Sequence, residues 1–283
     1  MALTPDVILA HPHCEAALRR QARACLATHE AQPRLASIFA TQQRWLLAML
    51  ALSLYLSRDG HPETPGLRAT LLLDEAVRLD IASRNTAHSF LQDMQQHGLV
   101  TIETSDSDRR LRLLHAQGFV IDMLHHWLSI QFETLDALDG GTRGTRFAAE
   151  PQAVARLQPL ITAALLAARP LRVQGGALSF FTWLGDGGLV LDWLIANMAE
   201  DVAENGRVRI AETSIPLLAQ QLSLSQADLT RRLKEARLAG GVGWSDLRGR
   251  IKLWITPDFR DEYCLYQATK LTLLDRVFDQ SRL

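Results

Sequence analysis

Two stretches of this sequence follow the same plan, and the second lies 142 residues after the first, as the positions of Ser83 and Ser225 show. The offset also brings residues of the same kind into register: Leu91 with Leu233, Gly98 with Gly240, and Val100 with Val242. A serine before a helix accepts backbone N–H groups, and a glycine after it takes the left-handed conformation that ends the helix. We therefore expect one structural unit to occur twice in the chain.

The first stretch is predicted to fold as helices followed by a hairpin. Apolar residues at helical spacing predict a long buried helix over 34–58 and two further helices over Leu67–Asp80 and Arg84–His97, the last with Ser83 as its N-cap. Two alternating, β-rich runs then flank the polar residues 105–110, which predicts a two-stranded hairpin. Helix, helix and hairpin is the order of a winged helix.

The second stretch repeats this order after a helix predicted over Leu189–Ala203, which would carry Met198 on its apolar face. Its other predicted elements are a strand, two helices with serine caps, and two strands around a turn: Arg207–Ile210, Ile215–Leu222 after Ser214, Gln226–Ala239 after Ser225, and 242–245 and 251–256 around Asp246–Gly249. A second winged helix is therefore expected.

The first unit resembles the winged helix of MarR-type transcriptional regulators. The resemblance rests on SRNTAHSFLQDMQQHGLV from Ser83 onward, on Asp108-Arg109-Arg110 at the end of a polar wing, and on LHAQGF at the start of a long helix. It covers about Arg44 to Leu138. The resemblance implies a recognition helix in the DNA major groove, a wing that contacts DNA, and a homodimer. The chain departs from that family in carrying the module twice, which puts the homodimer in question.

Taken together, these patterns predict a mainly α protein with small β-hairpins, in which two tandem winged helix-turn-helix modules are braced by long helices. We expect residues 1–138 to hold amino-terminal helices and the MarR-like first module, and residues 147–283 to hold a helical connector, the second module and a carboxyl-terminal helix. Residues 139–146 are the predicted linker, because DGGTRGTR has three glycines and no residue suited to a core.

The amino-terminal half of the second helix in each module is expected to enter the major groove. Short polar and long basic side chains are needed there, because they reach base edges and phosphates. The candidates in the first module are Arg84, Asn85, Thr86, His88 and Ser89, whereas Ala87, Phe90, Leu91 and Met94 have the spacing of core residues. In the second module the candidates are Gln226, Thr230, Arg231 and Lys234. Arg232 is also expected to face outward, and Asp228 counts against DNA binding because it lies in the same zone.

Arginines at the hairpin tips form a second set of candidates. Arg109 and Arg110 lie at the first tip, and Arg248 and Arg250 lie at the second. A guanidinium at a wing tip can enter a minor groove or bind a phosphate. Exposed arginines at a turn also commonly serve only solubility, so this role depends on their coincidence with a wing in both repeats.

Charge distinguishes the two modules. The whole chain has a net charge of -1, and residues 66–115 have the same net charge, with six basic and seven acidic side chains. Residues 207–256 have nine basic and four acidic side chains, a net charge of +5, whereas residues 116–206 have five and ten, a net charge of -5. Phosphate contacts are therefore expected mainly from the second module, and sequence selectivity from the first.

The sequence gives no sign of enzymatic chemistry. It has no GxSxG, HExxH, GxxxxGK[ST] or GxGxxG motif, so we expect a non-catalytic protein without cofactor or metal. His11, His13 and Cys14 could bind a metal with a fourth ligand from elsewhere in the chain, but their position in a near-terminal segment argues against it. Three unpaired cysteines, the absence of a signal pattern, and apolar runs too short for a bilayer favour a cytoplasmic protein without membrane contact.

The expected partner is double-stranded DNA, bound by a sequence-specific transcriptional regulator. Aromatic residues beside a glycine-rich stretch offer a pocket for a small aromatic effector, with plain core packing as the alternative: Phe180, Phe181, Trp183, Trp127 and Trp193. The long helices favour a homodimer slightly over a pseudo-two-fold monomer. Two other functions stay open, a winged-helix interaction module of a larger assembly and a plasmid-type replication initiator, although initiators of that kind are usually far more basic.

Overall fold

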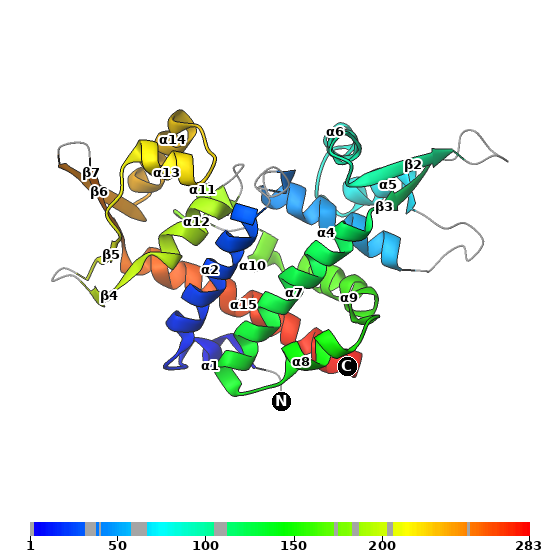
Figure 1. Ribbon diagram of the computed structural model, residues 1–283, viewed down its shortest axis with the longest axis horizontal. Helices are drawn as coiled ribbons and strands as arrows, with labels where there is room; N and C mark the ends of the chain where they lie inside the picture. The colour runs from blue at the N-terminus through cyan, green and yellow to red at the C-terminus, as the bar shows by residue number, and fades with distance from the viewer. Residues whose placement is uncertain are drawn as a thin grey trace. The chain divides into compact units, whose positions relative to one another are not determined.

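The computed structural model describes residues 3–31, 38–39, 41–57, 67–104, 112–172, 175–182, 187–202, 206–247 and 250–283. The described chain is mainly helical and contains two small antiparallel sheets, as the sequence predicted (Figure 1). No helix in the described ranges has the length and apolar character that a bilayer crossing requires.

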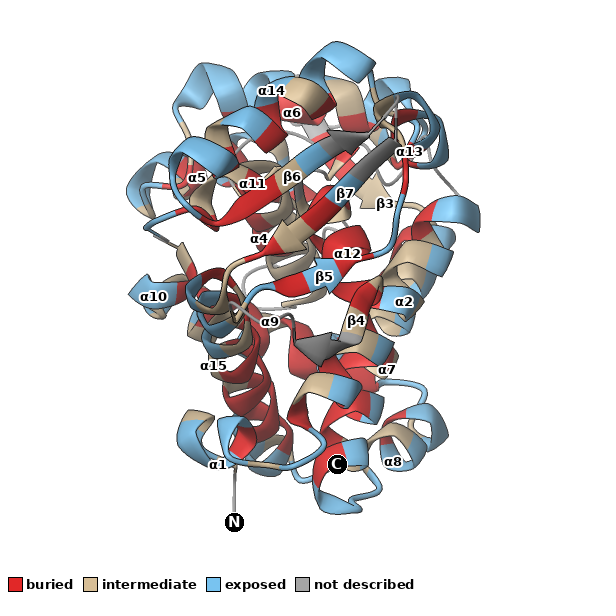
Figure 2. Ribbon diagram, turned by 90° about the vertical axis from the view of Figure 1, so that its left-hand side faces the viewer, coloured by how far each residue is buried: buried red, intermediate tan, exposed pale blue. Residues whose placement is uncertain are grey.

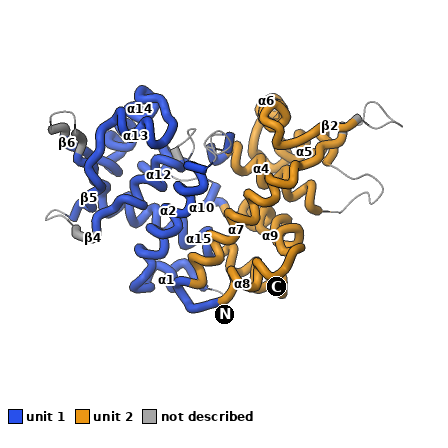
Figure 3. The backbone as a smooth tube through the Cα atoms, in the orientation of Figure 1, with its two compact units in different colours: residues 1–42, 137–141, 169–272 blue, residues 43–136, 142–168, 273–283 orange. Residues whose placement is uncertain are grey.

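Two compact units divide the chain, and neither is a continuous segment (Figure 3). Unit 1 consists of residues 1–42, 137–141 and 169–272, and unit 2 consists of residues 43–136, 142–168 and 273–283. The units therefore do not follow the predicted break at 139–146. Part of that predicted linker is helical, since α8 spans Arg143–Ala149. The physical reason is that Arg143 is held in unit 2 by ion pairs with Asp136 and Asp275.

Unit 2 contains the first repeated stretch. Its elements are α4 (Gln42–Leu56), β1 (Leu67–Arg68), α5 (Ala69–Arg78), α6 (Arg84–Gln96), β2 (Val100–Thr104), β3 (Arg112–Ala116), α7 (Gly118–Asp139), α8, and α9 (Ala153–Ala167), followed by the end of α15. The strands form an antiparallel sheet in the order β1-β3-β2. The helix predicted from Leu67 begins two residues late, because Leu67 pairs with Leu114 of β3 as a short strand.

Unit 1 contains the second repeated stretch together with the amino-terminal helices. Its elements are α1 (Pro5–Leu9), α2 (Cys14–Ala31), α10 (Arg169–Arg172), α11 (Ser179–Thr182), α12 (Gly187–Ala196), β4 (Met198–Val202), β5 (Val208–Ile210), α13 (Ile215–Gln221), α14 (Gln226–Leu238), β6 (Val242–Leu247), β7 (Arg250–Ile255) and most of α15 (Pro257–Ser281). Its sheet has the order β4-β5-β7-β6, and every neighbouring pair is antiparallel.

The predicted helix over Leu189–Ala203 is wrong in its second half. Helix α12 ends at Ala196, and the Asn197 side chain donates a 2.9 Å hydrogen bond to the Trp193 carbonyl beside this end. Met198 lies in β4, where it pairs with Ile210 and is buried, instead of on a helix face. The apolar spacing could not separate these alternatives, because a buried strand presents apolar residues too.

The same order of elements occurs in both units: strand, helix, helix, hairpin. The first strand pairs with the last in each case, giving β1-β3-β2 in unit 2 and β5-β7-β6 in unit 1, with β4 added at the edge. The caps expected from the sequence are present, since Ser83 accepts from the Thr86 N–H and Ser225 from the Asp228 N–H. Gly98 and Gly240 follow the second helices with φ of +69° and +79°.

Each second helix buries one side and exposes the other (Figure 2). The buried side of α6 carries the four residues predicted for the core, Ala87, Phe90, Leu91 and Met94. The buried side of α14 carries Leu229, Arg232, Leu233 and Ala236. The fold therefore leaves a free polar face on one helix of each unit.

Candidate nucleic-acid interface

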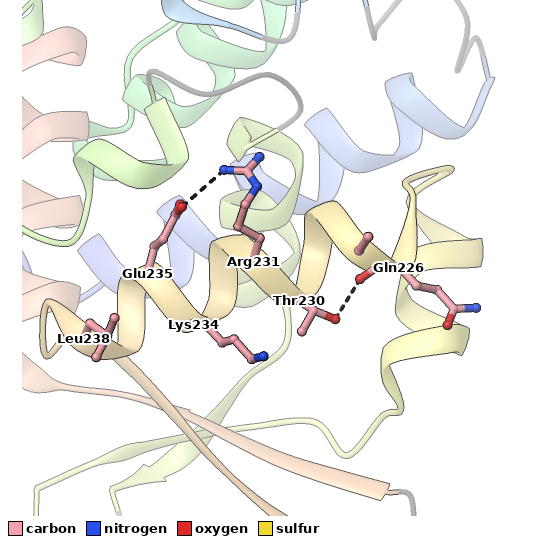
Figure 4. A pocket seen from close by; sticks show the side chains of 7 residues that line it. Gln226, Thr230, Arg231, Lys234, Glu235 and Leu238 are labelled. Carbon is pink, nitrogen blue, oxygen red and sulfur yellow. Dashed lines mark hydrogen bonds and ion pairs between the residues drawn. The ribbon is translucent and has the colours of Figure 1, made fainter.

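The exposed face of α14 carries the candidates of the second module. Gln226, Arg231 and Lys234 are exposed and Thr230 is half-buried. A shallow depression follows this face and is lined by residues of α14 alone: Gln226, Ala227, Thr230, Arg231, Lys234, Glu235 and Leu238 (Figure 4). The Thr230 hydroxyl donates a 2.7 Å hydrogen bond to the Gln226 carbonyl, so it is bonded to its own helix. An outward polar surface one helix long is what a major-groove contact requires.

Arg231 is held between two carboxylates on its own helix. Its Nη2 lies 3.3 Å from Asp228 Oδ1, and its Nη1 lies 3.3 Å from Glu235 Oε1. These hydrogen bonds, first to Asp228 and then to Glu235, raise the pKa of Arg231. Since all these groups are at least partly exposed, the pairs are weak and can exchange for a phosphate or a base edge.

Asp228 has a structural role that its sequence position did not reveal. Its backbone N–H donates to Ser225 Oγ at 3.0 Å, so the serine caps the helix, and the Ser225 hydroxyl donates to its Oδ2 at 2.8 Å. The hydrogen bond from Ser225, followed by that from Arg231, lowers the pKa of the Asp228 carboxyl. The acid that counted against DNA binding is therefore engaged at the start of the helix and with Arg231.

Lys234 and Arg232 differ sharply. Lys234 is exposed and has no carboxylate partner among the residues described. Arg232 was expected to face outward, but its exposed fraction is only 5% and it lies on the side of α14 that also carries Leu229 and Leu233. At 3.6 residues per turn, a residue three positions after Leu229 returns to the buried face. Arg232 is therefore not available to a ligand on the outer face.

The exposed face of α6 carries the candidates of the first module. Arg84, Asn85, Thr86, His88 and Ser89 are all exposed. Arg84 forms an ion pair with Asp74 of α5, and the Thr86 hydroxyl lies 2.9 Å from Ser83 Oγ. The side chains of Asn85, His88 and Ser89 make no hydrogen bond within the described ranges, so these three are free for a ligand.

The wing-tip candidates cannot be placed. Arg109, Arg110 and Arg248 lie outside the described residues. Arg250 begins β7, where it pairs with Leu247, but its side chain is also outside what the structure describes. At the second sheet lie two further exposed basic residues, Arg207 and Arg209, which the sequence pattern did not single out as candidates.

The candidates for other ligands have local explanations. The Nδ1 of His11 accepts a 3.2 Å hydrogen bond from the His13 backbone, and no cluster of three or more metal-binding side chains occurs in the described ranges. Among the aromatic residues, Phe181 is fully buried with its ring 5.6 Å from that of Phe259, and Trp127 packs against Trp45 at 5.8 Å. Trp183 lies outside the described residues. These contacts are those of core packing.

Comparison with known proteins identifies no relatives: no family model matches the sequence, and neither the curated proteins nor the solved structures contain a significant match.

Proposed function

We propose that the protein is a sequence-specific, non-catalytic transcriptional regulator that binds double-stranded DNA through two winged helices, one in each unit. The repeated order of strand, helix, helix and hairpin supports this, as do the serine caps at the same place in both repeats. In this proposal α6 and α14 are the recognition helices. The MarR-like features of the first stretch point the same way.

The observation that carries the proposal is the outer face of α14. It presents Gln226, Arg231 and Lys234 to solvent on a helix whose opposite side is buried. An amide can pair with adenine and a guanidinium with guanine, while an ammonium group neutralises phosphate. The net charge of +5 over residues 207–256 supplies the attraction to DNA that the first stretch lacks.

The experiment is a titration of a labelled random duplex at about 50 and 200 mM salt, because each neutralised phosphate contributes about 0.9 to the log-log salt slope. The variant Arg231→Ala/Lys234→Ala should bind more weakly than wild type and have a slope lower by about 1 to 2. The control Arg20→Ala/Arg169→Ala removes the same charge from exposed positions elsewhere in unit 1 and should keep the wild-type slope. Equal slopes for all three proteins would contradict the proposal.

A protein-interaction module is the second candidate, and one observation favours it. Leu238 at the end of α14 is 89% exposed, and Leu217 of α13 is 48% exposed. Exposed leucines mark a contact with another protein where they form a contiguous apolar patch. Under this alternative wild type would bind no duplex at either salt concentration.

The assembly state forms part of the proposal, because two recognition helices can come from one chain or from two. We propose a homodimer, with a pseudo-two-fold monomer as the alternative. Sedimentation equilibrium at tens of micromolar distinguishes them. A mass of 31.5 kDa would exclude the dimer and leave the two modules of one chain to bind DNA alone.

A further inference from the structure

The sheet of unit 1 has one buried face and one exposed face. Val208, Leu253 and Ile255 lie on the buried face, which packs toward the helices. The strand register places Arg209 opposite Trp254 and Trp254 opposite Gly243, so these residues share the other face. In Figure 2 strands β5, β6 and β7 lie toward the viewer. We call the surface formed by Arg207, Arg209, Lys252 and Trp254 the outer sheet face.

Trp254 is held flat on this face by a glycine. A Cβ placed on Gly243 would lie 2.4 Å from the indole ring, closer than real Cβ contacts allow, so only glycine lets the ring approach the strand this closely. The Arg207 guanidinium carbon lies 4.9 Å from the ring centroid. Since the backbone of Gly243 occupies one side of the ring, the guanidinium covers the other. The tryptophan is thus a support that fixes the orientation of Arg207.

Two positive charges on this face have no counterion among the residues that the structure describes. Arg207 and Arg209 are exposed, and neither has a carboxylate partner within the described part of the chain. Two positions apart in an extended chain, they lie on the same side and roughly 7 Å apart. Lys252 is different, because its Nζ lies 3.0 Å from Glu212. Two like charges this close repel each other, and an anion bound over both would relieve the repulsion.

We propose that the outer sheet face binds the phosphate backbone of duplex DNA beyond the segment contacted by α14. This inference rests on the proposed function and extends the contact from a helix to the sheet behind it. The chemistry recognised is phosphate and not bases, because both sides of the Trp254 ring are occupied and no ring face is left for stacking. A guanidinium held in a plane keeps its edge N–H groups for two phosphate oxygens.

The first sheet lacks this arrangement. One face carries Glu103 and His115, whose side chains lie 3.4 Å apart, together with the buried Leu113 and the exposed Arg68 of β1 opposite it. Glu103 lies on β2, across β3 from Arg68, and would repel a phosphate on that face. Among the described residues, an arginine stacked on a tryptophan beside a second arginine occurs on the sheet of unit 1 and not on that of unit 2, in agreement with the net charges of +5 and -1 of the two stretches.

The test compares Arg207→Ala/Arg209→Ala with the matched control Arg20→Ala/Arg169→Ala, which loses the same charge from exposed positions in unit 1. Each protein is titrated with random duplexes of about 12 and 30 base pairs at two salt concentrations. On the longer duplex the sheet variant should bind roughly tenfold more weakly, with a salt slope lower by about 1.8, the value for two lost phosphate contacts. On the shorter duplex the affinity and the salt slope of the sheet variant should be close to those of the control.

A second readout locates the contact directly. Phenylglyoxal, which modifies exposed guanidinium groups, should label Arg207 and Arg209 in the free wild-type protein and label them less with the longer duplex bound, while Arg20 stays reactive. Equal slopes for the sheet variant and the control, together with unchanged labelling, would overturn the inference. If the Arg231→Ala/Lys234→Ala variant still had a lower salt slope than wild type, the proposed function would stand without a contact at the outer sheet face.

Two further outcomes identify another occupant. If a single-stranded oligonucleotide but not a duplex protected Arg207 and Arg209 from phenylglyoxal, the inference would be overturned in favour of single-stranded nucleic acid. Protection by polyglutamate at equal charge concentration, without protection by duplex, would overturn it in favour of an acidic protein partner. Failure of wild type to bind any duplex would remove the proposed function and this inference together.

Discussion

Ser225 and Asp228 bond to each other twice at the start of α14: the serine hydroxyl accepts the aspartate backbone N–H at 3.0 Å and donates to the carboxylate at 2.8 Å. This pair explains how an acidic residue can lie among basic candidates on a helix that we propose to bind DNA. The serine caps the helix, and the carboxylate accepts from the serine hydroxyl and holds Arg231 at 3.3 Å. The carboxylate therefore orients a DNA-binding group while reducing its charge.

The first prediction separates these two roles of Asp228. Asp228→Ala should bind random duplex more tightly and with a steeper salt slope, because Arg231 gains a free guanidinium edge and a negative charge is lost. Ser225→Ala should lower the free energy of unfolding by about 1 kcal/mol through loss of the N-cap, with little change in the salt slope. Urea unfolding and duplex titration of both variants check this. Weaker binding by Asp228→Ala would show that the carboxylate itself contacts the DNA.

The second prediction concerns the ion pairs that hold α8 in unit 2. Arg143 Nε lies 2.7 Å from Asp275, whose side chain is fully buried, and Nη1 lies 3.1 Å from Asp136. Arg143→Met should destabilise the protein by about 3 to 5 kcal/mol, because it removes the guanidinium that is ion-paired with the buried Asp275 carboxylate. Arg143→Met/Asp275→Leu should recover part of this loss, since it removes the charge as well.

The control for this prediction is Arg156→Ala, an exposed position on α9, which should change the free energy of unfolding by no more than about 0.5 kcal/mol. The measurement is urea unfolding of the four proteins at pH 7. A double variant less stable than Arg143→Met would show that Asp275 is satisfied by other groups.

The third prediction concerns pH and the half-buried carboxyl of Asp192 in unit 1. Burial raises the pKa of Asp192 from 3.8 to about 7, and the nearby Lys270 opposes that rise. Between these pH values the folded protein binds a proton that the unfolded chain does not, so the free energy of unfolding falls as the pH rises from about 4 to 7. The pKa values of Cys25 and Tyr266 are raised to about 12, so neither group titrates in this window.

Asp192→Asn should abolish this part of the pH dependence. We expect wild type to lose roughly 1 to 3 kcal/mol of stability relative to the variant between pH 5 and pH 7. Urea unfolding of both proteins at the two pH values gives the difference. Parallel pH profiles would mean that Asp192 ionises in the folded protein at its ordinary pKa.

The fourth prediction concerns selectivity in the first module. Asn85 is exposed on α6 and its side chain makes no hydrogen bond within the described ranges. If Asn85 pairs with adenine, Asn85→Ala should cost about 1 to 3 kcal/mol on the preferred site and leave random duplex unaffected. Competition between a preferred and a random duplex measures this. Equal losses of affinity on both duplexes would show that Asn85 contacts the sugar-phosphate backbone of the DNA instead of the bases.

The parts of the fold predicted correctly are those decided by nearby residues. Ser83 and Ser225 lie next to the helices they cap, and Gly98 and Gly240 follow those helices with positive φ. The buried and exposed sides of α6 follow from helical spacing alone. Such features need no knowledge of distant segments, so a single sequence reveals them.

The errors arose where distant residues decide the structure. Met198 lies in a strand because it pairs with Ile210, and Arg143 begins a helix fixed by an aspartate 132 positions away. The prediction for Arg232 was wrong for a different reason: arginine is usually exposed, but Arg232 is buried. On the candidate surface, the Gly243, Trp254 and Arg207 stack joins three strands and could not be read from any one of them.

The central claim is sequence-specific recognition of duplex DNA, and it is tested most directly by selecting bound duplexes from a random pool and sequencing them over successive rounds. The account predicts that wild type enriches one defined motif, and that Asn85→Ala and Arg231→Ala each relax it at different positions. A pool that stays random through repeated rounds with wild type, at salt low enough for binding, would contradict the claim.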